Sequence, residues 1–256
     1  MRNLTFGYGY ASEIATASAT TTAAGNYAAE NAIALARGDT WKASGTSAGR
    51  LILDFGSPVT PTFLGLANCN WSGWGTTKLQ HSPDGAAWTD FLTLSGLPSV
   101  DSVQDWAAIL AAAPAKQFWC LYWAAPSAAP EVGVFYLGTA LTLTKNPSYP
   151  MTREFVFNVA RDRSEGAVVQ AEQTARTLTR FDMVWSTLTA TLRDEIETVV
   201  LAVDGPLEPF WLIPIDESGS STSGRAYLGR HEAFSIAARR RYIDTYEIGF
   251  SFLEEV

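Results

Sequence analysis

The chain has 256 residues, of which 47% are apolar and 12% aromatic, and its formal net charge is −8. This composition can bury a core, which excludes a disordered tail, and the length predicts two domains of ordinary size. The acidic balance argues against a nucleic-acid binder, because such proteins need clustered Lys and Arg to displace counterions. The only basic run, 239–241, is more simply a solvated strand end or a subunit contact.

Cysteine and histidine are scarce: Cys69, Cys120, His81 and His231 are the only ones. We expect both thiols to be reduced, with a single bridge between them as the alternative if they lie on facing strands. So few potential ligands argue against a transition-metal site. The chain starts with no basic region followed by an apolar run, and 18 successive apolar residues occur nowhere, so we expect cytoplasmic synthesis and no membrane insertion.

The first part of the chain predicts an all-β domain. Short apolar or alternating runs occur at 50–55, 62–67, 77–82, 118–123 and 132–137, separated by turn signals such as Pro83-Asp84-Gly85. Strands at this spacing predict a sandwich or jelly roll. Only the run 105–113, DWAAILAAA, has the composition of a short helix, which Pro114 would end.

A domain boundary is predicted near residue 145. Residues 1–143 contain 15 charged residues and residues 144–256 contain 29. The segment 145–150, KNPSYP, has two prolines, which disfavour helix and remove hydrogen-bond donors, so it predicts a stiff connector. We therefore expect domains at 1–144 and 151–256, joined by a linker at 145–150.

The second part predicts an α+β domain with one helix on an antiparallel sheet. Alternating runs at 152–159 and 176–184 predict strands, as do 209–215, 224–229, 231–237 and 244–252, while 218–224 is a flexible loop. Thr191 can cap a helix with acidic residues in its first turn, which Gly205-Pro206 would end. Its apolar face would consist of Leu192, Ile196, Val199, Val200 and Val203.

No constellation in the sequence predicts catalysis. The two histidines fall in different predicted domains, and no Ser or Cys has a sequence signature of activation. Asp84 and Asp90 flank Trp88, but Asp readily fills turn positions, so turn formation is the simpler explanation. We expect no enzymatic activity.

The tryptophans of the first part are more informative. The Gly-rich stretch NCNWSGWG places Trp71 and Trp74 beside Asn68 and Asn70. Exposed aromatic faces beside amides suit carbohydrate, because pyranose rings have apolar faces and polar edges. These four residues are the candidate sugar site. The alternative is that the two indoles fold over the core of their own domain or pack on a neighbouring subunit.

Several motifs of the first part resemble the discoidin, or coagulation-factor C-type, group of galactose-binding-like jelly rolls. They are Ala29-Glu30-Asn31-Ala32 leading to Gly38-Asp39-Thr40-Trp41, the strand 51–56, the hairpin Ser82-Pro83-Asp84-Gly85-Ala86-Ala87-Trp88, and the aromatic strand 118–123 followed by 134–137. The resemblance implies that Trp41 enters the core. In some members of this group the loop around Asp39 holds a structural calcium, chiefly through backbone oxygens, so Asp39 is the candidate metal position. We expect no other cofactor.

The second part is similar, in the order of its elements, to the distal tail proteins of long, non-contractile phage tails. The order runs through 177–185, 192–205, 210–214 and a closing strand at 246–253. The resemblance implies a tail-tube-like fold that closes into a hexameric ring around the DNA or tape-measure channel, with Tyr246, Phe250 and Phe252 as interface residues. In this family the ring domain usually comes first, and here the order is reversed.

Two functions from different classes follow from these patterns. The first is a structural virion component of a siphophage tail tip or baseplate, located at the virion tail tip after synthesis in the host cytoplasm. Its partners would be further copies of itself, the tail tube protein and other tail tip or hub proteins, without specific nucleic-acid binding. The alternative is a carbohydrate-binding module or adhesin that attaches to a host surface glycan. A weaker third is an accessory domain of a glycan-degrading enzyme.

Overall fold

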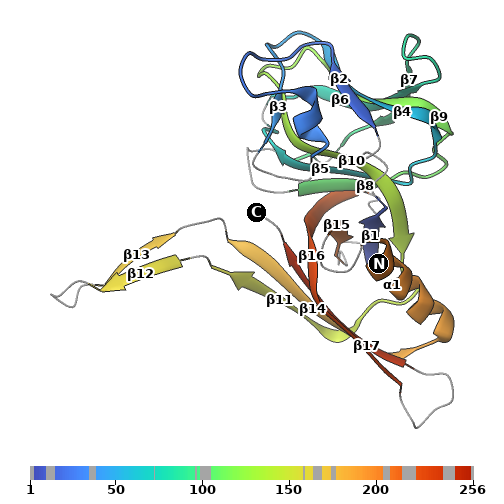
Figure 1. Cartoon of the computed structure of the whole chain (residues 1–256), viewed down its shortest axis with the longest axis vertical. Helices are drawn as coiled ribbons and strands as arrows, with labels where there is room; N and C mark the ends of the chain where they lie inside the picture. The colour runs from blue at the N-terminus through green and yellow to red at the C-terminus, as the bar shows by residue number, and fades with distance from the viewer. Residues whose placement is uncertain are drawn as a thin grey trace. The chain divides into compact units, whose positions relative to one another are not determined.

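The computed structural model describes residues 3–9, 15–34, 39–71, 73–95, 97–98, 105–157, 159–163, 169–173, 177–203, 208–214, 223–238 and 246–254. The chain divides into two compact units, coloured by residue number in Figure 1. Unit 1 contains residues 1–142 and 211–227, and unit 2 contains residues 143–210 and 228–256. Residues 211–227 therefore belong to unit 1, whereas we predicted them in the second domain.

Unit 1 contains a five-stranded antiparallel sheet. In spatial order its strands are β2 (Thr16–Ala19), β4 (Gly49–Val59), β9 (Lys116–Ala124), β6 (Thr76–Ser82) and β7 (Thr89–Thr93). Strand β4 continues through Gly56-Ser57-Pro58, where Gly56 has a positive φ and the pairing with β9 shifts in register between Asp54 and Val59.

The second sheet of unit 1 is also antiparallel. Its order is β15 (Phe210–Ile213), β1 (Thr5–Tyr8), β10 (Glu131–Thr142), β5 (Phe63–Cys69) and β8 (Asp105–Ile109). The short strand β3 (Trp41–Lys42) pairs with β10, and the first residues of β16 (Ser223–Ala238) pair with β8. A 3-10 helix, η2, covers Ala29–Ala32.

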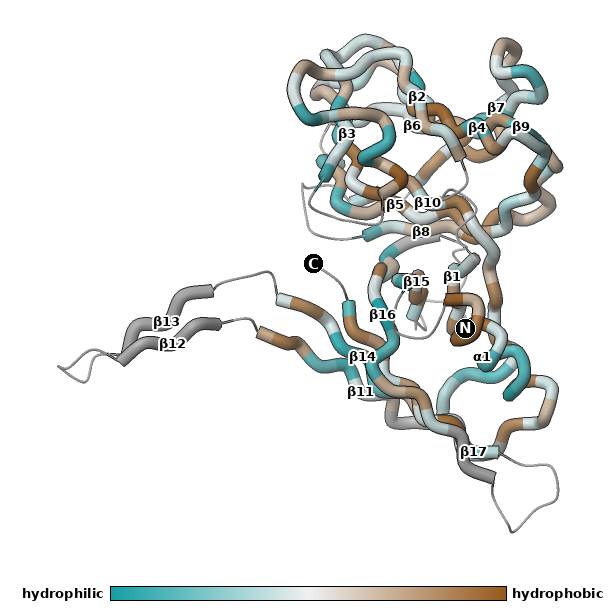
Figure 2. Tube along the Cα trace, viewed as in Figure 1, coloured by the Kyte–Doolittle hydropathy of each residue, from teal (hydrophilic) through white to brown (hydrophobic). Residues whose placement is uncertain are grey.

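The core of unit 1 lies between these two sheets. Leu51, Trp119 and Leu121 of the five-stranded sheet belong to the same buried cluster as Leu66 and Phe135 of the second sheet. Figure 2 shows hydrophobic stretches along β5 and β10, where most residues are buried. The predicted sandwich is confirmed, as are all five strands predicted in this part.

Trp41 is fully buried in this core and its ring lies 5.2 Å from that of Trp123. The prediction from the resemblance that Trp41 enters the core is therefore confirmed.

The predicted helix at 105–113 is wrong. Residues Asp105–Ile109 form strand β8, between β5 and the start of β16. Four of its five residues are buried, because both faces of this strand are covered. Burial and pairing on both sides outweigh the helix propensity of an alanine-rich run, which is worth only about 0.5 kcal/mol per residue.

Unit 2 contains an antiparallel sheet with the order β11 (Ser148–Val156), β14 (Leu178–Leu188), β17 (Tyr246–Glu254) and the remainder of β16. Strands β12 (Val159–Arg163) and β13 (Val169–Gln173) pair with each other. Because β11 begins at Ser148, part of the predicted linker is strand. The α+β fold class predicted for this part, a sheet with one helix, is confirmed for the described residues.

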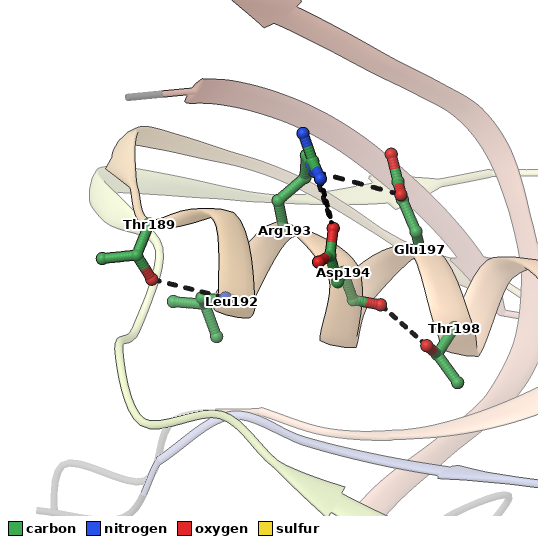
Figure 3. A network of polar contacts seen from close by, with 6 residues as sticks. All are labelled: Thr189, Leu192, Arg193, Asp194, Glu197 and Thr198. Carbon is green, nitrogen blue, oxygen red and sulfur yellow. Dashed lines mark hydrogen bonds and ion pairs between the residues drawn. The ribbon is translucent and has the colours of Figure 1, made fainter. Parts of the chain in front are cut away.

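Helix α1 (Ala190–Ala202) contacts β14 and β17. Its cap is Thr189 and not the predicted Thr191: the Thr189 hydroxyl accepts a hydrogen bond from the backbone N–H of Leu192 (Figure 3). Within the helix Arg193 pairs with Asp194 and Glu197 (Figure 3). The predicted apolar face, from Leu192 to Val203, is buried. The predicted stop at Gly205-Pro206 lies outside the described residues.

The described helices include none that is long and apolar enough to cross a membrane.

Candidate functional site

The predicted sugar platform is buried. Trp71 and Trp74 are 4% and 1% exposed, and their rings pack on each other with centroids 5.1 Å apart. The expectation of exposed indole faces is therefore wrong, and the alternative that these rings fold over the core of their own domain describes their position.

The neighbouring asparagines, Asn70 and Asn68, contact the segment 129–133. The Asn70 Oδ1 atom accepts hydrogen bonds from Trp74 Nε1 at 2.9 Å and from the backbone N–H of Glu131 at 2.6 Å. Its Nδ2 donates to the carbonyl of Ala129 at 2.9 Å. Asn68 adopts a positive φ and packs over Gly133, where an added Cβ would lie 2.6 Å from the Cβ of Asn68. These hydrogen bonds of Asn70 lie within unit 1, where they fix the loop to the segment that leads into β10.

The predicted ring interface is also placed differently. Tyr246, Phe250 and Phe252 lie on β17, which is hydrogen-bonded to β14 on one side and β16 on the other. A strand with two partners has no free edge for a neighbouring subunit. Phe250 and Phe252 are buried in the core of unit 2, against Phe210, and Tyr246 stacks under Arg193 at 4.3 Å. Phe250 and Phe252 are therefore core residues and do not fit the predicted interface, whereas Tyr246 is half-buried and its interface role stays a prediction.

The candidate calcium position at Asp39 stays a prediction, because only part of its loop belongs to the described residues. Asp39 is exposed, and the Nδ2 of Asn31 donates to the carbonyls of Asn26 and Thr40 nearby. No group of three His, Cys, Asp or Glu side chains that could hold a metal occurs in the part of the chain that the structure describes. The carbonyls of 35–38, which the prediction also involves, lie outside the described residues.

A different set of polar and aromatic side chains lies together on the five-stranded sheet. Along β4, β9 and β6, Leu51, Leu121 and Leu79 point into the core, so their neighbours in sequence point to the other face. We call this the outer face and define it by six residues, five on the sheet and one, Trp88, just before β7. They are Arg50, Lys78, Gln80, Trp88, Asp90 and Tyr122.

Arg50 is the centre of the outer face. Its guanidinium carbon lies 4.9 Å from the ring centroid of Tyr122 and 5.5 Å from that of Trp88. Its Nε donates to Gln80 Oε1 at 3.1 Å. The register explains the first contact, because Arg50 lies directly opposite Tyr122 in the β4–β9 pair. Two aromatic contacts and one hydrogen bond therefore restrict the orientation of this side chain.

The other polar groups of the outer face form a continuous network. Gln80 Nε2 donates to Asp90 Oδ1 at 2.6 Å, and Lys78 Nζ pairs with Asp90 Oδ2 at 2.5 Å. These two hydrogen bonds, that of Lys78 first, lower the pKa of Asp90 below its ordinary value, so the carboxylate is charged at neutral pH. The network fixes Gln80, which in turn orients Arg50.

A local turn places Trp88 on the outer face. The Asp84 Oδ1 atom accepts hydrogen bonds from the backbone N–H groups of Ala86 and Ala87 and from the Ser82 hydroxyl. These bonds lower the pKa of Asp84, and Gly85 provides the positive φ that the turn needs. The chain then leads directly from this turn through Trp88 into β7. Asp84 is thus a turn former, as expected.

Cys120 points to the same side of the sheet as the outer face but is fully buried, with its Sγ 3.6 Å from Gln80 Oε1. Burial raises the pKa of the Cys120 thiol well above its usual range, so it is protonated and unreactive at neutral pH. Cys69 is also buried. Both cysteines are free, so the alternative of a bridge between them is wrong.

We did not predict the outer face from the sequence, although the sequence contains one signal for it. The alternation in 50–55 and 118–123 already separates Arg50 and Tyr122 from the leucines beside them. Which residues then meet across the strands depends on the register, which alternation does not give.

No protein-family model and no curated protein matches the chain. Solved structures do match. Chitosan-binding module 1 from a chitosanase/glucanase of Paenibacillus sp. IK-5 is 16% identical with a TM-score of 0.42, and the match covers 50% of this chain and 97% of that module. The module CpGH89CBM32-5 from Clostridium perfringens, in complex with GalNAc-β-1,3-galactose, is 14% identical with a TM-score of 0.44, covering 50% of this chain and 98% of the module.

A third match is the family 32 carbohydrate-binding module of Clostridium perfringens NanJ in complex with galactose. It is 12% identical with a TM-score of 0.42, and the match covers 54% of this chain and 99% of the module. These structural neighbours are carbohydrate-binding modules. At such identities and TM-scores the likeness concerns strand arrangement over about half of the chain and decides nothing about the ligand.

Proposed function

We propose that this protein binds carbohydrate and that the outer face of the five-stranded sheet is the binding surface. The observation that carries the proposal is the combination of half-exposed Trp88 and Tyr122 rings with Arg50, Lys78, Gln80 and Asp90 on one sheet face. The sequence offered this function as the alternative, but with Trp71 and Trp74 as the sugar platform. Since both indoles are buried, the proposed surface is a different one.

The side chains of the outer face are chemically complementary to a sugar ring. A pyranose ring has an apolar face, which suits an aromatic ring, and hydroxyl groups around its edge, which need donors and acceptors. On the outer face the amide, carboxylate and cationic groups provide both kinds. They are held by one another, so little side-chain entropy is lost when a ligand binds.

The test is binding of a glycan array, followed by titration calorimetry with Trp88→Ala and Tyr122→Ala. We expect each variant to lose at least about tenfold in affinity, because one aromatic contact contributes about 1.5 kcal/mol. Tyr27→Ala is the matched control: Tyr27 is also half-exposed and lies under a cation, Lys42 at 5.7 Å, but it lies outside the outer face. A flat array response, or an equal loss with Tyr27→Ala, would contradict the proposal.

A second candidate is the structural role in a phage tail tip, in which copies of the chain assemble into a ring with tail tube and hub proteins as neighbours. The observation in its favour concerns β11, which is the edge strand of the unit 2 sheet in the part of the chain that the structure describes. Phe155 on this strand is 51% exposed, and Phe157 directly after it is 68% exposed. Large exposed apolar side chains at a sheet edge are typical of surfaces that pair with another chain.

Sedimentation velocity over a range of concentrations, with electron microscopy of the particles, tests this candidate. Phe155→Ser combined with Phe157→Ser should abolish assembly, whereas Leu201→Ser should not, although Leu201 on α1 is 78% exposed. A chain that stays monomeric at every concentration, and is absent from virions, would rule the candidate out.

A further inference from the structure

We infer that the ligand of the outer face is an acidic glycan, and that its carboxylate or sulfate group pairs with Arg50. This inference rests on the proposed function and specifies the class of carbohydrate. It starts from Arg50, a half-buried cation that forms no ion pair within 4 Å among the described residues, although the charge of Asp90 lies near enough to interact with it.

Arg50 forms no ion pair with any residue that the structure describes. The nearby carboxylate, Asp90, is bonded to Lys78 and Gln80 instead. An arginine that lies among aromatic rings has lost part of its hydration, and in proteins such a group normally has an anionic partner. In a chain whose net charge is −8, an unpaired and oriented cation is notable.

The orientation of Arg50 determines which of its atoms are available. Nε is used by Gln80, and the Tyr122 and Trp88 rings restrict the plane of the guanidinium. Apart from a side-chain hydrogen bond between Arg50 and the Cys120 thiol, no hydrogen bond in the part of the chain that the structure describes involves the terminal Nη1 and Nη2 groups. These N–H groups form the planar fork that binds carboxylate and sulfate through two parallel hydrogen bonds.

The remaining charges of the outer face favour the same class of ligand. Lys78 is paired with Asp90, so these two groups cancel and Arg50 is left as the net charge of the outer face. A neutral sugar would leave this charge uncompensated, whereas an acidic sugar would neutralise it and still stack on the aromatic rings. Uronic acids and sulfated sugars both have this chemistry.

Matched pairs of probes, measured by titration calorimetry on the full chain, separate charge from sugar. The carboxylate pair is tetragalacturonate and its methyl ester, and the sulfate pair is a κ-carrageenan tetrasaccharide and its desulfated form. We expect the acidic member of at least one pair to bind at least about tenfold more tightly than its neutral form, because a charged hydrogen-bonded contact has that strength. The pair that shows the preference identifies the anion.

Arg50→Gln should remove this preference, so that the acidic and neutral forms of each pair bind with affinities within about twofold of each other. Arg225→Gln is the matched control, since Arg225 is exposed in the same unit and lies 5.1 Å from the Tyr227 ring. It removes the same charge and should keep the preference. If Arg50→Gln does not fold, Arg50→Lys retains the charge without the fork and should reduce the preference.

The outcomes distinguish the inference from the proposed function. Equal affinity for acidic and neutral forms would overturn the inference while glycan binding stands, as would a preference that survives in both Arg50 variants. Absence of binding to every glycan on the array and to all four probes would overturn both.

Discussion

Replacing Asn70 by alanine tests whether the loop at 68–74 is structural. Asn70→Ala removes hydrogen bonds to Trp74 Nε1, to the N–H of Glu131 and to the carbonyl of Ala129. A net contribution of about 1 kcal/mol for each bond gives a loss of about 3 kcal/mol in the free energy of unfolding. That loss is a large part of the 5 to 15 kcal/mol or so that stabilises an ordinary domain.

The assay is urea unfolding followed by tryptophan fluorescence. Gln117→Ala is the comparison, because Gln117 makes one hydrogen bond, from Nε2 to Asp54 Oδ1 at 2.8 Å, and should lose about 1 kcal/mol or less. The reasoning would be refuted if Asn70→Ala unfolds within about 1 kcal/mol of the wild type. If that variant also lost glycan affinity, Asn70 would be a ligand-binding residue, as the sequence first indicated.

Three further predictions concern other parts of the chain. Gly65→Ala places a Cβ 2.4 Å from the buried Trp211 ring and should lower the free energy of unfolding, measured by thermal unfolding, by about 1 to 3 kcal/mol. Gly45→Ala, where no atom lies within 4 Å of the added Cβ, should be nearly neutral. Equal losses of stability in the two variants would contradict this prediction. Thr189→Ala should cost about 1 kcal/mol by removing the cap of α1, and an unchanged midpoint in urea would refute the assignment. Burial lowers the pKa of His81, aided by the charge of Lys116, so the unfolded chain takes up the proton first and stability falls as pH drops below about 6.5. His81→Gln should weaken this dependence between pH 7 and 5, and parallel stability curves would speak against it.

Alternation predicted the strands of unit 1 because the sandwich covers one face of most of them. It failed at 105–109, where both faces are covered and an alanine-rich run has no alternation to detect. It also separated β16 into two strands, since the polar residues around Arg230 interrupt the pattern within one continuous strand. Local signals therefore predicted strands with an alternating pattern or a run of large apolar residues, such as β5 and β10, and missed the alanine-rich strand β8, which is set by pairing with distant partners.

The candidate site shows the same limit. Aromatic and amide composition directed attention to the loop at 68–74, but exposure there depends on hydrogen bonds to 129–131, which are remote in sequence. Arg50, Gln80 and Tyr122 are brought together only by the pairing of β4, β9 and β6. Residues 211–227 belong to unit 1 because β15 pairs with β1 and the start of β16 pairs with β8. No local sequence pattern encodes these pairings.

The most direct test of the central claim, that the outer face binds carbohydrate, is an NMR titration of the tryptophan indole N–H signals. The full chain is titrated with the tightest-binding glycan of the array. We predict that the Trp88 signal moves with ligand concentration while those of the buried Trp71 and Trp74 remain in place. Movement of Trp71 and Trp74 with a stationary Trp88 would contradict the account and return the binding site to the loop.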